Sequence, residues 1–214
     1  EIAQSEGYDY ISVAHHKDDQ AESILAHIIR GSGLNGLTGM SVVQSEYAIP
    51  VVRPLLDVTK EDLLAYIGTK HISYCVDSTN EDVRYQRNRI RHRIIPELEA
   101  VNPAVVDAIV RLGSSVNEDV MVISDLTSRT FDKLVSIGDD EVRISRRALR
   151  QEPLAIQRRL WQRLVSTIDS DLTLTSAHQE QLLDIVNTGE KKTFTIKSIK
   201  VIAQCDTIKV YCKH

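Results

Sequence analysis

Eight consecutive residues near the start of the sequence gather side chains that can bind metal ions, phosphates or protons. The segment His15-His16-Lys17-Asp18-Asp19-Gln20-Ala21-Glu22 holds two imidazoles and three carboxylates, and Arg30-Gly31-Ser32-Gly33 follows it. Carboxylates suit Mg²⁺, which takes one or two of them and leaves its other positions to water and phosphate. Arginine suits phosphate oxygens. The residue types and their spacing therefore predict a site for magnesium and a nucleotide.

Each of these residues also has a structural explanation. Asp18 could cap a helix, and Asp19 could be a first-turn acid that suits the helix dipole. Arg30 could lie near the helix C-terminus, where the dipole favours a cation, and Gly31 with Gly33 could end the helix. The functional interpretation instead places Arg30 on a nucleotide phosphate and lets the glycine backbone approach a ligand.

A zinc site is the competing interpretation of the two histidines, because histidine is a common zinc ligand. His15 and His16 are adjacent at the end of an expected strand, and neighbouring strand residues point to opposite faces. One metal ion is therefore badly placed to bind both rings. Ligands of open α/β sheets bind at such strand ends, so the cluster favours magnesium and nucleotide over zinc.

A second motif is basic, although the whole chain carries a net charge of −4. Asp77-Ser78-Thr79-Asn80 is followed by five arginines between positions 84 and 93. In a helix, one side would carry Arg84, Arg87, Asn88 and Arg91, and another side would carry Arg89 and Arg93. Neighbouring acids could neutralise the arginines in a solvated surface of little energetic value. Arginine is also the side chain best suited to bidentate phosphate contacts, so the motif predicts contact with RNA or ATP.

Alternating strands and helices in the first hundred residues are typical of a parallel α/β sheet. The expected strands cover residues 8–14, 48–52 and 71–76, and the first of them ends at the histidines. Apolar residues at helical spacing predict a helix over 18–30 and another after Thr59. The second of these helices should turn Leu63, Leu64 and Ile67 inward.

The pattern changes beyond residue 80. One helix is expected over 83–99, with Ile90, Ile94 and Leu98 as its apolar stripe. Further elements are a long helix from 102 to 135, a strand over 141–144, helices over 153–168 and 176–186, and two or three antiparallel strands over 192–211. We therefore expect two domains, an α/β domain over 1–100 and a mainly helical α+β domain over 101–214.

Composition limits the cellular setting and the partners. Cys75, Cys205 and Cys212 show no Cys-x-x-Cys spacing, which disfavours a zinc ribbon or a sulfur cluster and favours a reducing, cytoplasmic setting. No apolar run approaches the roughly 18 residues that span a membrane, so no membrane partner is expected. The acidic balance gives no global attraction to nucleic acid, so any RNA contact depends on the local arginine-rich segment.

Four segments, in this order and spacing, resemble those of the tRNA(Ile)-lysidine synthetase family, which belongs to the N-type ATP pyrophosphatase or PP-loop superfamily. They are HHKDDQAES, RGSGLNGLTGM, RPLL and DSTNEDVRYQRNRIRHRIIPEL. Residues 174–178 and the β pattern after them also resemble the second domain of that family. The resemblance covers nearly the whole chain. It implies an incomplete, parallel-sheet adenylating domain followed by a tRNA-contacting domain.

The resemblance also implies a reaction and a role for each residue. Members of the family use ATP and Mg²⁺ to adenylate O2 of the wobble cytidine in the CAU anticodon of tRNA(Ile), and the ε-amino group of free L-lysine then displaces AMP at C2. The implied catalytic residues are Asp19 and Arg87, and the implied magnesium ligands are Asp18 and Asp19. The implied ATP-binding residues are His15, His16, Asp18, Arg30, Gly31 and Gly33, and the implied tRNA contacts are Arg84, Asn88, Arg89, Arg91 and Arg93.

The sequence departs from the family at its start, because the Ser-Gly-Gly-x-Asp-Ser loop that grips ATP is missing. We therefore expect an internal fragment that is inactive alone, whose exposed sheet edge would favour self-association into a homodimer. Three alternatives remain open: a related tRNA-thiolating enzyme, a non-catalytic tRNA-binding module, and a metal-dependent hydrolase. The thiolating enzymes generally use Cys-x-x-Cys pairs, which this sequence lacks.

Overall fold

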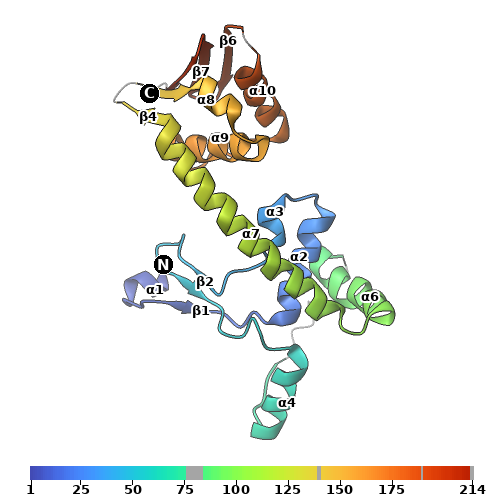
Figure 1. Cartoon of the computed structure of the whole chain (residues 1–214). Coiled ribbons are helices and arrows are strands. Elements are labelled where there is room, and N and C mark those ends of the chain that lie inside the picture. Colours follow the sequence, from blue (N-terminus) through green and yellow to red (C-terminus); the bar gives the residue numbers. More distant parts are fainter. Residues whose placement is uncertain (76–83, 139–140, 189, 213–214) are drawn as a thin grey trace. The chain divides into compact units, whose positions relative to one another are not determined.

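A computed structural model of the chain describes residues 1–75, 84–138, 141–188 and 190–212 (Figure 1). The chain divides into two compact units, residues 1–120 and 121–214. The division lies inside one long helix, α7 (Val105–Leu134), because the first part of that helix packs within unit 1. Residue 100, as the boundary between an adenylating domain and a tRNA-contacting domain, stays a prediction.

Unit 1 is built from short strands and several helices. In chain order they are α1 (Ile2–Ser5), β1 (Ile11–Ser12), α2 (Lys17–Ile29), α3 (Leu34–Leu37), β2 (Val43–Gln44), β3 (Val51–Val52), α4 (Lys60–Lys70), α5 (Gln86–Arg89), the π-helical η2 (Ile90–Ile94), α6 (Ile95–Val101) and the beginning of α7. The sequence pattern predicted α2 and α4 closely, but it did not indicate α1, α3 or β2.

The sheet of unit 1 has the strand order β1–β3–β2. Ile11 lies opposite Val51 in a parallel pair, which confirms the parallel pairing expected from alternating strands and helices. Val43 lies opposite Val52 in an antiparallel pair, so the sheet is mixed rather than purely parallel. Residues 71–75 form no strand, and Val76 lies outside the described residues.

Helix α4 corrects the expectation of an inward apolar face. None of its residues is buried, and Leu64 is 41% exposed. Local signals are enough to form this helix, because the Thr59 side chain accepts a hydrogen bond from the Asp62 amide and two acids lie in the first turn. Apolar residues at helical spacing therefore identified the helix correctly without identifying a buried face.

The helix predicted over 83–99 is present from Gln86 onward as α5, η2 and α6, and Val83 lies outside the described residues. Its middle widens into the π-helical turn just before Pro96. Proline has no amide hydrogen and its ring clashes with the carbonyl four residues earlier, so a wider turn relieves both problems. Ile90 and Ile95 are buried, whereas Ile94 and Leu98 are only partly buried.

Unit 2 contains the end of α7 and a five-stranded antiparallel sheet of order β4–β5–β8–β7–β6. Its elements are β4 (Val135–Ile137), β5 (Val142–Ser145), α8 (Arg146–Gln151), α9 (Leu154–Ile168), α10 (Ser176–Asn187), β6 (Lys192–Ile196), β7 (Ile199–Gln204) and β8 (Thr207–Cys212). This arrangement confirms the last three strands and the helices over 153–168 and 176–186, whereas β4 and α8 were not predicted.

One hydrophobic core holds unit 2 together. Alternate residues of the strands are buried, including Ile199 and Val201, and they form a core cluster with Leu160 and Trp161 of α9 and Val186 of α10. Period-two alternation is the signature of a sheet with one covered face. No helix within the described ranges is both long enough and apolar enough to cross a membrane.

Gly39 allows the loop after α3 to pass close to α2, and we expect Gly39→Ala to lower the free energy of unfolding by about 1–2 kcal/mol. Gly39 has a φ of +72°, and a Cβ there would lie 2.7 Å from the Gln20 side chain. That amide cannot easily move, because it donates to the Met40 carbonyl and accepts from the Met40 amide. Urea unfolding measures the loss.

Gly68 provides the control for this substitution. It lies in α4, its φ is not in the left-handed region, and a Cβ would meet nothing within 4 Å. Gly68→Ala should be neutral or stabilising by up to about 1 kcal/mol, because alanine is the better helix former. Equal losses of stability in the two variants would contradict the account of Gly39.

Candidate active site

Helix α2 begins at the residues that the sequence singled out. His16 is its N-cap, with extended backbone at φ −125°, so Asp18 is not the cap. The His16 amide donates to Asp19 Oδ2 at 3.0 Å, and the Lys17 amide donates to the Val58 carbonyl at 2.9 Å. These bonds place the Asp19 carboxylate at the first turn of α2, just after β1.

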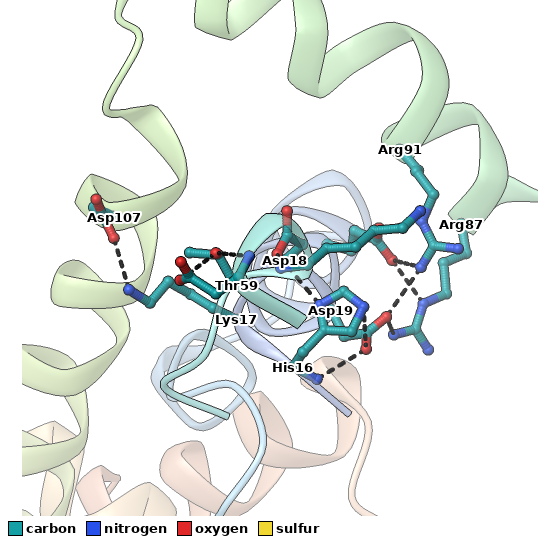
Figure 2. Close-up of polar contacts among 11 residues, drawn as sticks. His16, Lys17, Asp18, Asp19, Thr59, Arg87, Arg91 and Asp107 are labelled. Atoms are coloured by element: carbon teal, nitrogen blue, oxygen red, sulfur yellow. Dashed lines mark hydrogen bonds and ion pairs between the residues drawn. The ribbon is translucent and has the colours of Figure 1, made fainter. Parts of the chain in front are cut away.

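Two acids of α2 meet two arginines from the arginine-rich segment (Figure 2). Asp19 Oδ1 accepts hydrogen bonds from Arg87 Nη2 and Arg91 Nη2, each at 3.0 Å. Glu22 accepts from Arg87 Nε at 2.9 Å and from Arg91 through Nε at 2.5 Å and Nη2 at 2.9 Å. We call Asp19, Glu22, Arg87 and Arg91 the ion cluster. It joins residues that are about 70 positions apart in the sequence.

Burial differs sharply among the four residues of the ion cluster. The Glu22 side chain is 1% exposed and that of Arg91 is 23% exposed, whereas that of Arg87 is 47% exposed. Hydrogen bonding to Glu22, together with the charges of Glu22 and Asp19, raises the pKa of Arg91 further above its ordinary value. Two positive and two negative charges balance, which permits burial. Arg87 has the most exposed side chain of the four, so it is the one most accessible to a ligand.

Asp18 faces a different partner from its neighbour. Its Oδ2 accepts a hydrogen bond of 2.9 Å from the Lys60 amide, the first amide of α4, and lies 3.3 Å from His16 Nδ1. The His16 side chain and then the Lys60 amide hold the pKa of Asp18 down, to about 2 from 3.8, against the opposing effect of partial burial. Asp18 therefore helps to attach the beginning of α4 to α2.

Asp18 should make stability depend on pH in the acidic range. Its folded-state pKa lies below its unfolded value, so its contribution is present above about pH 4 and is lost as the pH falls towards about 2. The carboxylate is 34% exposed, and solvent screening limits the effect to about 1 kcal/mol. In urea unfolding, Asp18→Asn should be less stable than the parent at pH 7, and the difference should shrink at pH 3. A constant difference at both pH values would contradict this role.

Arg53 is a buried arginine beside His15. Its Nε donates to His15 Nδ1 at 3.3 Å, Nη1 donates to the Ser41 carbonyl at 3.0 Å, and Nη2 donates to Gln44 Oε1 at 2.8 Å. The three bonds join Arg53, which directly follows β3, to Gln44 of β2, to Ser41 just before β2 and to His15 in the segment after β1. Burial lowers the pKa of His15 below its ordinary value, which favours the neutral ring.

The donor set accommodates magnesium better at Asp18 than at Asp19. Both Asp19 oxygens accept hydrogen bonds, from the His16 amide and from the two arginines of the ion cluster. Asp18 is part-exposed, and its Oδ1 has no hydrogen bond or ion pair among the described residues. Those residues include no group of three or more histidine, cysteine or acidic side chains that could enclose a metal ion. A magnesium ion that keeps water and phosphate ligands needs only one or two carboxylates.

The structure does not bring Arg30, Gly31 and Gly33 to this cluster. They follow the opposite end of α2, and the eleven residues from Asp19 to Arg30 correspond to about 16 Å along the helix. Gly31 has a φ of +73°, and its amide donates to the Ile28 carbonyl, which is the geometry of a helix end. Arg30 is exposed. Contacts of these three residues with ATP stay predictions.

The remaining predicted tRNA contacts lie on or just before the same helix as the cluster arginines. Arg84, Arg89 and Arg93 are exposed, whereas Asn88 is buried. The polar segment Asp77-Ser78-Thr79-Asn80 lies outside the described residues. An exposed row of arginines fits a polyanion, but Asn88 would contact RNA only through a change at its buried position.

Sequence reasoning gave no separate role to Glu22 or Arg53. Glu22 follows Asp19 by three residues and Arg91 follows Arg87 by four, so each pair shares a helix face. That match of two acids with two arginines was the available signal for the ion cluster. Arg53 stood in the RPLL segment without any indication of a partner, because its contacts with Ser41, Gln44 and His15 depend on the fold.

Comparison with known proteins identifies the class first. Residues 1–98 match the family described as a PP-loop domain. The chain is also similar to tRNA(Ile)-lysidine synthases from three bacteria. It is 44% identical to that of Porphyromonas gingivalis over 63% of this chain and 29% of the relative. The values are 31%, 86% and 39% for Geobacter sulfurreducens, and 30%, 88% and 41% for Bacillus subtilis.

The protein thus has a PP-loop domain of the α/β adenylating class. More narrowly, the chain belongs to the tRNA(Ile)-lysidine synthase family. It spans less than half the length of these relatives. The two segments that form the ion cluster are among the four that resemble this family, and both lie within the matched domain.

Proposed function

We propose that the full-length gene product joins free L-lysine to C2 of the wobble cytidine in a tRNA(Ile) with a CAU anticodon. In this reaction O2 of the cytidine attacks the α-phosphorus of ATP and pyrophosphate leaves. The ε-amino group of lysine then attacks C2, AMP leaves with the former O2, and the amine gives up a proton. The observation that carries the proposal is the ion cluster of Asp19, Glu22, Arg87 and Arg91 within a PP-loop domain.

Arg87 is the residue of the ion cluster that we assign to the substrate. Nearly half of its side chain is exposed, and its Nη1 has no hydrogen bond among the described residues. Arginine contacts phosphates through such free N–H groups, and a fixed cation stabilises the charge that develops on phosphoryl oxygens. Asp19 and Glu22 hold the guanidinium in place through Nη2 and Nε. Asp19 and Arg87 are therefore the proposed catalytic pair.

We assign magnesium to Asp18, with Asp19 as a second ligand only if an arginine of the ion cluster releases it. When bound, the ion would offset negative charge on the ATP phosphates. His15 and His16, which lie at the same end of β1, are proposed to border the nucleotide. His16 Nδ1 is buried and makes no hydrogen bond among the described residues, although it lies 3.3 Å from Asp18 Oδ2.

We assign Arg84, Arg89 and Arg93 to the tRNA backbone. They are exposed within ten residues of Arg87, so a tRNA that placed its anticodon at the ion cluster would bring phosphates close to them. Contacts of this kind release counterions, so binding should weaken as salt rises. Replacing Arg89 and Arg93 with alanine should reduce the salt dependence of tRNA affinity, whereas Asp19→Asn should leave that dependence unchanged.

Incorporation of labelled lysine tests the proposed reaction. The full-length gene product is incubated with ATP, Mg²⁺, labelled L-lysine and a tRNA(Ile) transcript with a CAU anticodon. We expect one lysine incorporated for each AMP and each pyrophosphate released. A transcript with uridine in place of the wobble cytidine should incorporate none. Consumption of ATP without lysine incorporation would overturn the proposal and would favour a related tRNA-adenylating enzyme.

A further inference from the structure

The contact between Arg53 and His15 determines where the imidazole carries its proton. Arg53 is 9% exposed, and its guanidinium is fixed on three sides by His15 Nδ1, the Ser41 carbonyl and Gln44 Oε1. A guanidinium has only donors and stays protonated in proteins. The nitrogen that faces Arg53 Nε must therefore act as an acceptor.

The number of protons on a neutral imidazole determines which nitrogen of His15 is the donor. A neutral imidazole has one N–H group and one acceptor nitrogen. Burial, and then the positive charges of Arg87 and Arg53, favour the neutral ring, whereas the charge of Asp19 opposes them. With Nδ1 accepting from Arg53, the single ring proton is on Nε2. His15 is then a donor at Nε2 and has no nitrogen left to take up a proton without losing its contact with Arg53.

We propose that Arg53 is a positioning residue that fixes His15 as a neutral hydrogen-bond donor through Nε2. The inference rests on the proposed function, in which His15 borders the nucleotide. The ligand group it suits is an acceptor oxygen, such as a phosphoryl oxygen of ATP. His15 and Arg53 also line a groove of about 410 Å³ with apolar residues of β1 and β3, so a ligand has space beside the ring.

This assignment also excludes a role for His15. Removal of a proton from the lysine ammonium or amine needs a base with a free lone pair. In His15 the only lone pair in the ring plane faces the Arg53 guanidinium. His15 therefore orients or stabilises an oxygen of the substrate, and another group takes the proton from lysine.

Nuclear magnetic resonance tests the tautomer directly. The full-length gene product is labelled with ¹⁵N-histidine, and the His15 signals are assigned by their loss in His15→Gln. At pH 8 we expect a proton on Nε2 and none on Nδ1. A protonated Nδ1 in the parent protein would overturn the proposal, and this measurement does not depend on any Arg53 variant folding.

Two variants show whether Arg53 is responsible. Arg53→Met removes every donor, so a measurable fraction of the Nδ1–H form should appear. Gln44→Ala is the matched control, because it removes another partner of Arg53 and leaves the Nε contact with His15 in place. We expect the parent tautomer in Gln44→Ala. An unchanged tautomer in folded Arg53→Met would overturn the positioning role.

Substitution of His15 tests whether the donor matters for the reaction. The terminal amide of glutamine can occupy the position of Nε2, whereas that of asparagine reaches only the position of Nδ1. We expect His15→Gln to keep at least about tenfold more kcat/KM for lysine incorporation than His15→Asn. The reverse order would contradict the proposal. If the parent protein forms no lysidine, the proposed function fails, while the tautomer measurement still decides the inference.

Discussion

Arg91→Met is expected to lower the free energy of unfolding by about 3–5 kcal/mol, because it leaves a buried carboxylate without its bidentate partner. Glu22 is 1% exposed and receives two of its three hydrogen bonds from Arg91. A large loss occurs when one member of a buried ion pair is removed and the other stays charged. Urea unfolding at pH 7 measures the effect.

Arg89 and Arg93 supply the controls for Arg91→Met. They lie on the same helix and are exposed, so Arg89→Met and Arg93→Met should change the stability by no more than about 0.5 kcal/mol. Combining Arg91→Met with Glu22→Leu removes the stranded charge and should recover part of the loss. A loss in Arg91→Met no larger than in the controls would mean that the ion cluster does not stabilise the fold.

Arg87→Ala is expected to lower kcat/KM for lysidine formation by about 10²–10³-fold with a smaller effect on stability than Arg91→Met. Arg87 is about half-exposed, and its loss leaves Glu22 still paired with Arg91, so the loss of stability is smaller. The proposed role that the variant loses is that of a fixed cation offered to a phosphoryl oxygen. Arg87→Lys should not restore activity, because an ammonium cannot donate in the planar arrangement that joins Glu22 and Asp19.

The control for Arg87→Ala is Arg93→Ala, which removes an exposed arginine from the same segment. We expect Arg93→Ala to weaken tRNA binding modestly and to keep the turnover of bound substrate near that of the parent. Rates are measured at saturating ATP and lysine with the full-length gene product. Equal losses of turnover in the two variants would contradict a specific role for Arg87 at the reacting phosphate.

The sequence predicted secondary structure most closely where the spacing of apolar residues matches the face that is buried in the fold. Helix α2 was predicted closely because the apolar spacing of Ala21 and Ile24 matches a buried face. The strands of unit 2 were predicted because Ile199 and Val201 follow a period of two over one covered face. Helix α4 was predicted, but the exposure of its apolar residues was not, because the cap that begins the helix is a local signal that says nothing about burial.

Sequence patterns did not identify which polar side chains pair with one another across the fold. The arginines were identified as a group, but their partners Asp19 and Glu22 lie about 70 positions away and are paired only by the fold. Asp18 is not the cap of α2, as the sequence had allowed. His16 is the N-cap, and Asp18 instead accepts a hydrogen bond from the first amide of α4. Arg30 belongs to the same segment of the sequence but lies at the other end of α2, since eleven residues of helix separate it from Asp19 by about 16 Å.

Release of pyrophosphate by Asp19→Asn tests the central claim most directly. The claim is that the Asp19–Arg87 pair forms the reacting centre of an ATP-dependent tRNA ligase. Asparagine keeps the shape of Asp19 but cannot hold Arg87 and Arg91 through charge. The variant of the full-length gene product should bind CAU-anticodon tRNA as the parent does, while its tRNA-dependent pyrophosphate release falls by about 10²-fold or more. Pyrophosphate release at the rate of the parent protein, with tRNA affinity unchanged, would contradict the claim.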